Sequence, residues 1–219
     1  MICTIRGIIS ACIPNLLIQR RLPLWKSRES NSLLLTFDDG PDEKITPTVL
    51  NILKNNDIRA IFFLVGYRAE KYPDIVRQIV EDGHKIGNHT YAHYNDRVSG
   101  YSEFRCDILK CQEIISNITG VEPRYFRPPR GIISLPGLLA ARRIGLQNIF
   151  WSLGGGEWGK NRYAKIDFII QSIIKSAKNR DILLLHDDHS YVVDILNAIL
   201  PALREKNFDF NRGIDSIYR

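Results

Sequence analysis

Short apolar runs alternate with segments of helical periodicity from Ser32 to the C-terminus of this chain. This alternation is typical of a parallel β/α fold, because two parallel strands need a long crossover connection and a helix usually forms it. We expect strands near residues 32–37, 59–65, 84–88, 124–127, 147–152, 181–186 and 207–210.

Helix start and stop signals lie between these runs. Thr46 followed by Pro47 predicts a capped helix with a proline in its first turn, extending to about Asn56. Pro73 opens a second helix, which Gly83 closes. The pattern amounts to six or seven β/α units, which form either an open sheet or a barrel. Further helices are expected at residues 102–117, 136–144 and 167–177.

The composition fits one domain with a single core. The 219 residues are 44% hydrophobic, and no linker, repeat or low-complexity tract divides them. We expect a basic, partly apolar arm at residues 1–31 and one folded domain at residues 32–219. The net charge of +6 belongs mainly to the arm, since residues outside 1–28 contain 25 basic and 24 acidic side chains. Without a basic stripe interleaved with aromatic residues, no nucleic-acid partner is expected.

The arm bears on the location of the protein. It is too short and too interrupted, by Pro14 and Pro23, to span a bilayer, but a peripheral membrane contact through it is expected. Its sequence is not that of a secretory signal, and the four cysteines lack zinc-site spacing. We therefore expect free thiols and a location in the cytoplasm or at the cytoplasmic membrane surface, with secretion as the alternative.

Two adjacent acids and two histidines point to a metal site. Asp38 and Asp39 end an apolar run, and successive strand side chains point in opposite directions, so at least one carboxylate needs a cation. His89 and His93, if they lie on a helical turn, share a face and can bind one ion. With Asp39 they form three ligands that leave a position for water, as in hydrolytic zinc sites. Asp38 is then free for proton transfer.

Each piece also has a simpler explanation. Asp-Asp-Gly-Pro is by itself a common solvated turn, and a His-x-x-x-His pair can be a solvated helix face. Their conjunction favours the metal site. His84 and His189 match no such pattern and are expected to be structural or surface residues, and Asp187 is expected to be a supporting hydrogen-bond partner.

The candidate polar residues all follow the carboxyl ends of expected strands. In parallel β/α barrels catalytic residues gather on that face, and side chains from five strands converge only if the sheet curls around an axis. We therefore expect an α/β fold, a distorted (β/α) barrel of seven parallel strands in a single domain. The residues are Asp38 and Asp39 after the first strand, His89 and His93 after the third, Arg127 after the fourth, Glu157 and Trp158 after the fifth, and His186 at the end of the sixth.

Five motifs occur in order at these strand ends, at residues 36–41 (TFDDGP), 89–93 (HTYAH), 127–131 (RPPRG), 151–158 (WSLGGGEW) and 183–187 (LLLHD). In these motifs the chain resembles the polysaccharide deacetylases, the NodB-homology group of carbohydrate esterases. The match extends from about Ser32 to Phe210. The resemblance implies a distorted (β/α) barrel and makes residues 32–219 the catalytic domain.

The resemblance implies hydrolysis of an acetyl group, most often N-acetyl, on a sugar of a polysaccharide or oligosaccharide. Asp39, His89 and His93 are then ligands of a divalent metal, zinc in the first place and cobalt in the second. A metal lowers the pKa of water enough for a carboxylate base to take its proton, which assigns the base to Asp38.

The remaining catalytic roles also come from the resemblance. Arg127 orients the base, and His186 protonates the departing amine, for which its imidazole must start protonated. Glu157 is the carboxylate expected to favour that cation. The metal and a backbone N–H near Arg130 stabilise the oxyanion.

Substrate contacts are expected from Pro128, Arg130, Trp158 and Leu184. Trp158 would line the sugar groove and Leu184 the pocket for the acetyl methyl group, although both residue types also fill cores. Arg130 stands where the family most often has tyrosine, which suggests an anionic or unusual glycan unless this arginine is only a solvated surface residue. Glu157 replaces the usual aspartate, and Gly154 stands where aspartate is common.

Two other functions use the same residues. An amidase acting on a small non-sugar molecule needs the same metal and base, because the fold does not determine the substrate. A glycan-binding module that has lost turnover is the third hypothesis, and the changes at Gly154 and Glu157 allow it. Bound metal and acetate release discriminate among the three.

Overall fold

The computed structural model describes residues 31–93, 101–132, 134–154 and 166–216. Seven parallel strands follow one another in the order β5-β4-β3-β2-β1-β7-β6, and β8 pairs with the start of β1. The expected distorted barrel of seven parallel strands is confirmed. The strands are β1 (Asn31–Asp38), β2 (Ile61–Leu64), β3 (Lys85–Asn88), β4 (Tyr125–Phe126), β5 (Gln147–Asn148), β6 (Leu153–Gly154), β7 (Asp181–His186) and β8 (Phe208–Asp209).

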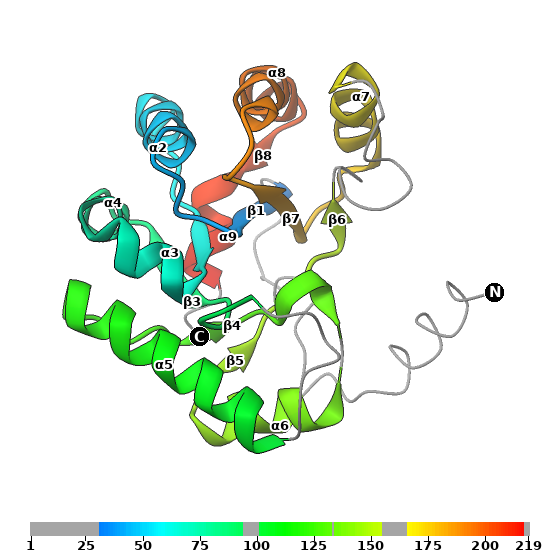
Figure 1. Cartoon of the computed structure of the whole chain (residues 1–219). Coiled ribbons are helices and arrows are strands. Elements are labelled where there is room, and N and C mark those ends of the chain that lie inside the picture. The colour runs from blue at the N-terminus through cyan, green and yellow to red at the C-terminus, as the bar shows by residue number, and fades with distance from the viewer. Residues whose placement is uncertain (1–30, 94–100, 133, 155–165, 217–219) are drawn as a thin grey trace.

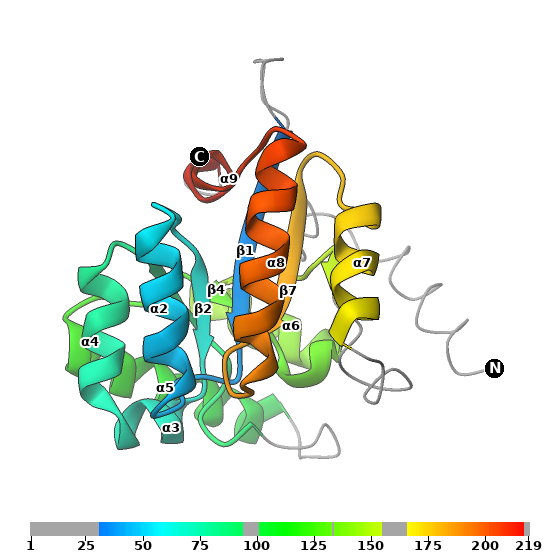
Figure 2. The ribbon, with the colours of Figure 1, turned by 90° about the horizontal axis from the view of Figure 1, so that it is seen from above.

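Helices surround the strands, as Figure 1 shows in a view along the strands. Seen from above, α8 crosses in front of β1 and β7 with α2 and α7 on either side (Figure 2), and α8 contacts both of these helices. All five helices expected from the sequence are present, and α3, α8 and α9 are additional. The helices are α2 (Ile45–Asn55), α3 (Gly66–Lys71), α4 (Pro73–Glu81), α5 (Tyr101–Thr119), α6 (Leu135–Arg143), α7 (Ile166–Ser176), α8 (Tyr191–Glu205) and α9 (Phe210–Ser216), with a 3₁₀ turn η1 (Pro129–Gly131).

The barrel differs from the expectation at residues 147–152, which were predicted to form one strand. This segment instead contributes the two-residue strand β5, which pairs with β4, and leads to the two-residue strand β6, which pairs with β7. Between them, the carbonyls of Ile149 and Phe150 accept hydrogen bonds from the Arg127 guanidinium at 3.0 and 3.3 Å. A side chain therefore satisfies the backbone where a continuous strand would need a neighbour.

The alternation of side chains along β1 separates two cores. Residues of one parity pack outward beneath the helices, and residues of the other parity point into the barrel with partners from β2, β4 and β7. The apolar residues of β1 are fully buried on both faces. The outward residues are Leu33, Leu35 and Phe37, and the inward ones are Leu34, Thr36 and Asp38.

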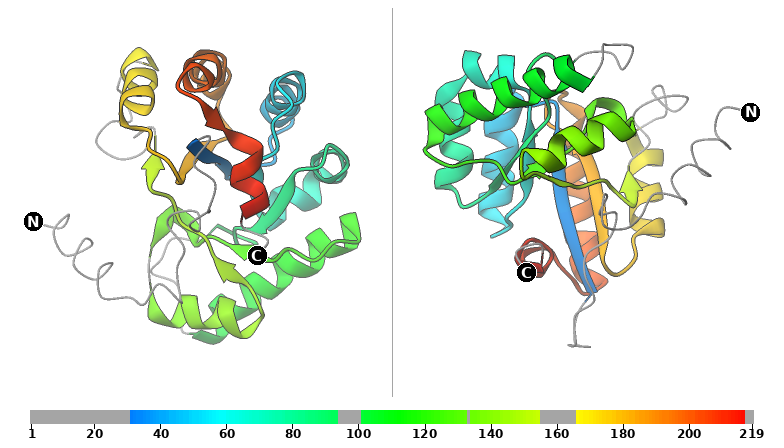
Figure 3. Two further views of the ribbon diagram at one scale, coloured as in Figure 1. Left: turned by 180° about the vertical axis from the view of Figure 1, so that it is seen from behind. Right: turned by 90° about the horizontal axis from the view of Figure 1, so that it is seen from below.

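Helix α9 covers the end of the barrel at which β1 begins (Figure 3). Its Ile214 joins the inner cluster with Leu34 and Ile182. Gly213 allows the close approach, because a Cβ on it would lie 2.4 Å from the carbonyl oxygen of Leu33. Asp38 and His186, two of the candidate catalytic residues, lie at the opposite end, where β1 and β7 finish.

The start of α2 corrects the expected cap at Thr46. The helix begins at Ile45, and the carboxylate of Asp42 accepts the N–H groups of Lys44 and Ile45, each at 2.9 Å. The Thr46 hydroxyl instead accepts the N–H of Asp42 and donates to the Asp187 carboxylate at 2.6 Å. Thr46 therefore joins the loop after β1 to the loop after β7.

The N-terminal arm and its boundary stay predictions, because residues 1–30 lie outside the described ranges. Strand β1 already begins at Asn31. No helix within the described ranges combines the length and the apolar character needed to cross a bilayer. Cys106 and Cys111 are free thiols, as expected, the first exposed and the second buried.

His84 is a buried structural residue, and it makes stability depend on pH. Its ring packs edge-on against Phe62, and its Nδ1 accepts the N–H of Ala60 at 3.2 Å. Burial, which the charge of Arg59 reinforces and that of Asp82 opposes, lowers the pKa of His84 to about 4. The unfolded state therefore takes up this proton first, so the His84 contribution is complete above pH 6.5 and is lost as the pH falls toward 4.

We expect His84→Gln to remove this part of the pH dependence. Between pH 7 and pH 4.5, the wild type should lose about 2 kcal/mol more of its unfolding free energy than the variant does. Urea unfolding of both proteins at the two pH values measures the difference. Equal losses would show that His84 is not the buried neutral imidazole described above.

Candidate active site

Two carboxylates meet where β1 ends. Asp38 points into the barrel by the alternation of β1, and Asp39 follows with a left-handed φ of 74°. This backbone turn brings the Asp39 carboxylate back toward His89, which Asp38 also approaches. Both acids are buried, at 4% and 8% exposure. Arg127 contacts Asp38, and the two histidines contact Asp39.

The two histidines do not lie on a helical turn, contrary to the expectation. They belong to a loop after β3 in which Thr90 and His93 have φ values of 67° and 49°. Polar side chains stabilise this loop, because Asn88 Oδ1 accepts the N–H of Thr90 at 2.9 Å and Thr90 Oγ1 accepts the N–H of His93 at 3.2 Å. Asp107 of α5 accepts the N–H between them, that of Ala92.

The ring nitrogens nevertheless converge as the sequence predicts. Asp39 Oδ1 lies 3.3 Å from His89 Nε2 and 3.0 Å from His93 Nε2. Among the described residues, these three form a group whose ligand atoms all lie within 4.8 Å of one another. Ligand atoms about 2.1 Å from one tetrahedral ion are roughly 3.4 Å apart, so the spacing suits a zinc-sized cation.

Hydrogen bonding provides an independent test of that fit. His89 Nδ1 lies 2.7 Å from the carbonyl oxygen of Arg127, and a carbonyl only accepts, so Nδ1 carries the proton. In the neutral ring Nε2 then presents a lone pair to Asp39 Oδ1, a buried oxygen without a hydrogen-bond partner among the described residues. Two lone pairs at 3.3 Å require a positive charge between them. The residues fit a metal cation.

The carboxylates and the histidines of the site also shift each other's pKa values. Burial opposes the charged forms of both Asp39 and His89. The close contacts and charges of the two histidines outweigh this and lower the pKa of Asp39 well below its usual range. The charges of Asp38 and Asp39 likewise outweigh burial and raise the pKa of His89. The site therefore stabilises positive charge beside its carboxylates.

Arg127 lies at the centre of the barrel and is fully buried. Its Nη1 donates to Asp38 Oδ1 at 2.6 Å and to Thr36 Oγ1 at 2.9 Å, and its guanidinium stacks 4.1 Å from the centroid of Phe63. Burial lowers the pKa of Arg127, although Asp38 opposes this shift. With one oxygen held by Arg127, the other oxygen of Asp38 lies 3.9 Å from His89 Nε2.

Strand β7 brings His186 and Leu184 to the same end of the barrel. His186 is in register with Asp38 on the adjacent strand and is buried, at 7% exposure. Leu184 is in register with Thr36 and is also buried. Both are an even number of residues from Ile182 on this strand, so their side chains point to the same side as Ile182, which belongs to the inner cluster. The expected acid and the expected base thus stand side by side, as strands about 4.8 Å apart allow.

Asp187 supports the site without joining the three metal-ligand candidates. It is fully buried and accepts the hydroxyl of Thr46, as the sequence suggested for a hydrogen-bond partner. Burial, reinforced by the charges of Asp188 and Asp39, raises the pKa of Asp187 to about 7. Gly40 is necessary beside it, since a Cβ there would lie 2.4 Å from the Asp187 carboxylate.

The third motif forms a tight turn beside Arg127. Pro128 is extended, Arg130 is left-handed with φ of 58° and is exposed, and the N–H of Gly131 donates to the carbonyl of Pro128. Trp151 packs against this turn, where a Cβ on Gly131 would be 2.2 Å from the indole. Glu157 and Trp158, which were expected to complete the site, lie outside the described residues.

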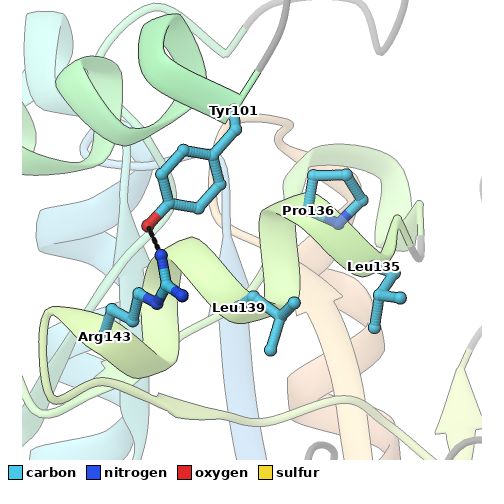
Figure 4. A pocket seen from close by; sticks show the side chains of 5 residues that line it. All are labelled: Tyr101, Leu135, Pro136, Leu139 and Arg143. Atoms are coloured by element: carbon cyan, nitrogen blue, oxygen red, sulfur yellow. Dashed lines mark hydrogen bonds between the residues drawn. The ribbon is translucent and has the colours of Figure 1, made fainter.

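A shallow apolar groove of about 280 Å³ lies between the start of α5 and α6, and Figure 4 shows its lining. The Tyr101 hydroxyl accepts a hydrogen bond from Arg143 across it. None of the predicted catalytic residues lines this groove. Its residues are Tyr101, Leu135, Pro136, Leu139 and Arg143.

Several residues that shape the site were not identified from the sequence. The sequence predicts a helix cap at Thr46 and no role for Arg68 or Asp188. Arg68 donates to the backbone carbonyl of Asp39 at 2.7 Å and to Asp188 at 3.2 Å. Asp188 directly follows the LLLHD motif, which is the one local signal that could have drawn attention to it.

Comparisons with known proteins agree with this geometry. A family model described as polysaccharide deacetylase matches residues 26–149. The chain belongs to the polysaccharide deacetylase family. A peptidoglycan-N-acetylglucosamine deacetylase of Bacillus cereus is 36% identical over 180 residues, which are 80% of this chain and 64% of that relative. A chitooligosaccharide deacetylase of Azorhizobium caulinodans is 34% identical over 197 residues, covering 83% of this chain and 92% of the relative.

Solved structures of polysaccharide deacetylases share the fold. The crystal structure of a peptidoglycan N-acetylglucosamine deacetylase in complex with 4-naphthalen-1-yl-N-oxidanyl-benzamide has a TM-score of 0.80 at 32% identity. The alignment covers 90% of this chain and 91% of that one. The family resemblance seen in the five motifs is thus confirmed, and so is the (β/α) barrel.

Proposed function

We propose that this polysaccharide deacetylase removes the N-acetyl group from N-acetylglucosamine residues of a glycan and depends on a divalent metal, zinc in the first place. One observation carries the proposal: the three metal-ligand candidates lie beside the buried carboxylate of Asp38, one oxygen of which is not held by Arg127. Asp38 Oδ2 lies 3.9 Å from His89 Nε2, while Oδ1 is held by Arg127. The relatives named for N-acetylglucosamine and chitooligosaccharide substrates support the substrate class.

Each residue has a defined part in hydrolysis of the acetamide. When bound by Asp39, His89 and His93, the metal supplies Lewis acidity, which polarises the acetyl carbonyl and lowers the pKa of water. Asp38 accepts the proton of the attacking water. His186, in register with Asp38, donates a proton to the amine nitrogen as the C–N bond breaks. The products are acetate and a free amino sugar.

The neighbouring residues position the substrate in this proposal. The backbone N–H of Arg130, held in the turn after Pro128, stabilises the oxyanion. Leu184 faces the barrel end and lines the space for the acetyl methyl group. The exposed Arg130 side chain, together with Pro128, borders the sugar chain, where a guanidinium favours a substrate with a carboxylate or phosphate. Glu157 and Trp158 keep the roles that the family resemblance implies.

Acetate release tests the proposal. Zinc- or cobalt-loaded protein is assayed on N-acetylglucosamine oligomers, peptidoglycan fragments and O-acetylated polysaccharides. We expect release from N-acetylated glycans, loss of that release after chelation, and recovery on adding metal back. Activity that survives complete metal removal would contradict metal dependence. No release from any glycan by metal-loaded protein would contradict the deacetylase assignment and favour a small-molecule amidase or a binding module.

A further inference from the structure

The junction of β2 and α3 contacts both segments that carry the metal-ligand candidates. The N–H of Val65 donates to the carbonyl of Gly40, directly after Asp39. The next two N–H groups donate to carbonyls of the histidine loop, Gly66 to Thr90 and Tyr67 to Tyr91. One short stretch of backbone therefore bonds to the loops after β1 and after β3. None of these three hydrogen bonds is made to the backbone carbonyl of Asp39.

The Arg68 side chain supplies that contact. Its Nη1 donates to the carbonyl oxygen of Asp39 at 2.7 Å and to Asp188 Oδ2 at 3.2 Å, while Nε donates to the Tyr67 hydroxyl. The side chains of Arg68 and Asp188 are 27% and 10% exposed, so water competes only partly for this pair. Asp188 lies two residues after His186. Arg68 thus connects the ligand-bearing loop after β1 with the loop that follows the proposed acid.

The Asp39 backbone needs such support. Its φ of 74° is in the left-handed region, which costs free energy for residues with a side chain, although less for aspartate than for most. The same backbone determines where the Asp39 carboxylate lies relative to His89 and His93. A charged donor on the Asp39 carbonyl holds this peptide, and the carboxylate of Asp188 holds the donor. Partners of this kind, one step removed from a metal, commonly tune its affinity.

We propose that Arg68 and Asp188 form a positioning pair that fixes the backbone of Asp39 and thereby raises the affinity of the site for its metal. The proposal rests on the proposed metal-dependent function. It makes Arg68 a positioning residue, because its guanidinium contacts the backbone of a ligand and not the reacting atoms.

Zinc affinity measured by competition with a chromophoric chelator tests the pair. We expect Arg68→Met to weaken zinc binding about 10-fold or more, the usual size of such effects. Arg68→Lys, which keeps the charge but not the fork of donors, should restore part of the affinity. Arg59→Met is the matched control, because it removes an arginine–aspartate pair of similar length, 3.0 Å to Asp215, at the opposite end of the barrel, where Arg59 precedes β2 and Asp215 lies on α9. It should bind zinc as the wild type does.

A double-mutant cycle separates positioning from general damage. If the two residues act as a pair, Arg68→Met combined with Asp188→Asn should bind zinc no more weakly than Arg68→Met alone. Acetate release by Arg68→Met should recover when zinc is raised, which a merely structural defect would not allow. Unchanged zinc affinity in Arg68→Met would overturn the proposal. If Arg68→Met does not fold, Arg68→Lys with the affinity of the Arg59→Met control would overturn it equally.

The test does not depend on the glycan. Weakened zinc binding in Arg68→Met, in a protein that releases no acetate from any glycan, would support the positioning pair while contradicting the proposed function. Normal zinc binding in Arg68→Met, in a protein that is an active deacetylase, would contradict the pair alone.

Discussion

Replacing Asp38 by asparagine is expected to lower kcat for acetate release by about 10²- to 10⁴-fold, the range that a general base contributes. The amide oxygen can still accept the Arg127 donor that Asp38 Oδ1 accepts at 2.6 Å, so the local structure should persist. What disappears is the second carboxylate oxygen, which faces His89. An amide cannot take up the proton of the attacking water.

Three measurements make this result specific. Zinc content should stay stoichiometric in Asp38→Asn, because Asp38 is not one of the three metal-ligand candidates. KM should change less than kcat, since the base acts in the transition state. Asp74→Asn, at an exposed carboxylate paired with Arg77 on α4, serves as the control and should keep full activity. An Asp38→Asn enzyme with near-normal kcat would show that another group is the base.

Replacing Arg127 by methionine is expected to lower the free energy of unfolding by about 3–5 kcal/mol, because it leaves a buried carboxylate without its partner. The guanidinium is fully buried and bonds to Asp38, to Thr36 and to the two carbonyls of Ile149 and Phe150. Methionine fills similar space but satisfies none of these groups. The loss should therefore be far larger than for an exposed ion pair, which contributes about 1 kcal/mol or less.

Urea unfolding of a small set of variants checks this explanation. The double variant Arg127→Met/Asp38→Asn should be more stable than Arg127→Met, because it no longer buries an unpaired charge. Arg127→Lys should fall between Arg127→Met and the wild type, since an ammonium can pair with Asp38 but cannot reach both carbonyls. A loss below about 1 kcal/mol in Arg127→Met would show that the buried pair is not a main source of stability.

The location of the site at one end of the barrel was predictable because it follows from strand geometry. Polar residues that end apolar runs must meet at the carboxyl ends of parallel strands, and Asp38, His89 and His186 do so. The three metal-ligand candidates come together at this end, as the sequence predicts. Their local structure was not predicted correctly, because spacing alone does not distinguish a helical turn from the loop in which His89 and His93 lie.

Contacts between loops far apart in the chain could not be predicted. Thr46 bonds to Asp187, 141 residues away, and Arg68 bonds to Asp188, 120 residues away. Neither pair has a local signal, because threonine before a proline looks like a helix cap and an arginine on a short helix looks like a surface residue. The gap between β5 and β6 was missed for a related reason: its carbonyls are satisfied by the Arg127 side chain and not by a neighbouring strand.

The sequence by itself determined the class of the fold, the end of the barrel that carries the chemistry, and the residue types available there. These depend on the period of apolar side chains and on the family motifs, both of which can be read along the chain. Only the tertiary structure decided how the ligand atoms meet, which oxygen of Asp38 faces the metal-ligand candidates, and which residues hold the backbone of Asp39. These depend on distances of a few ångströms between segments that only packing brings together.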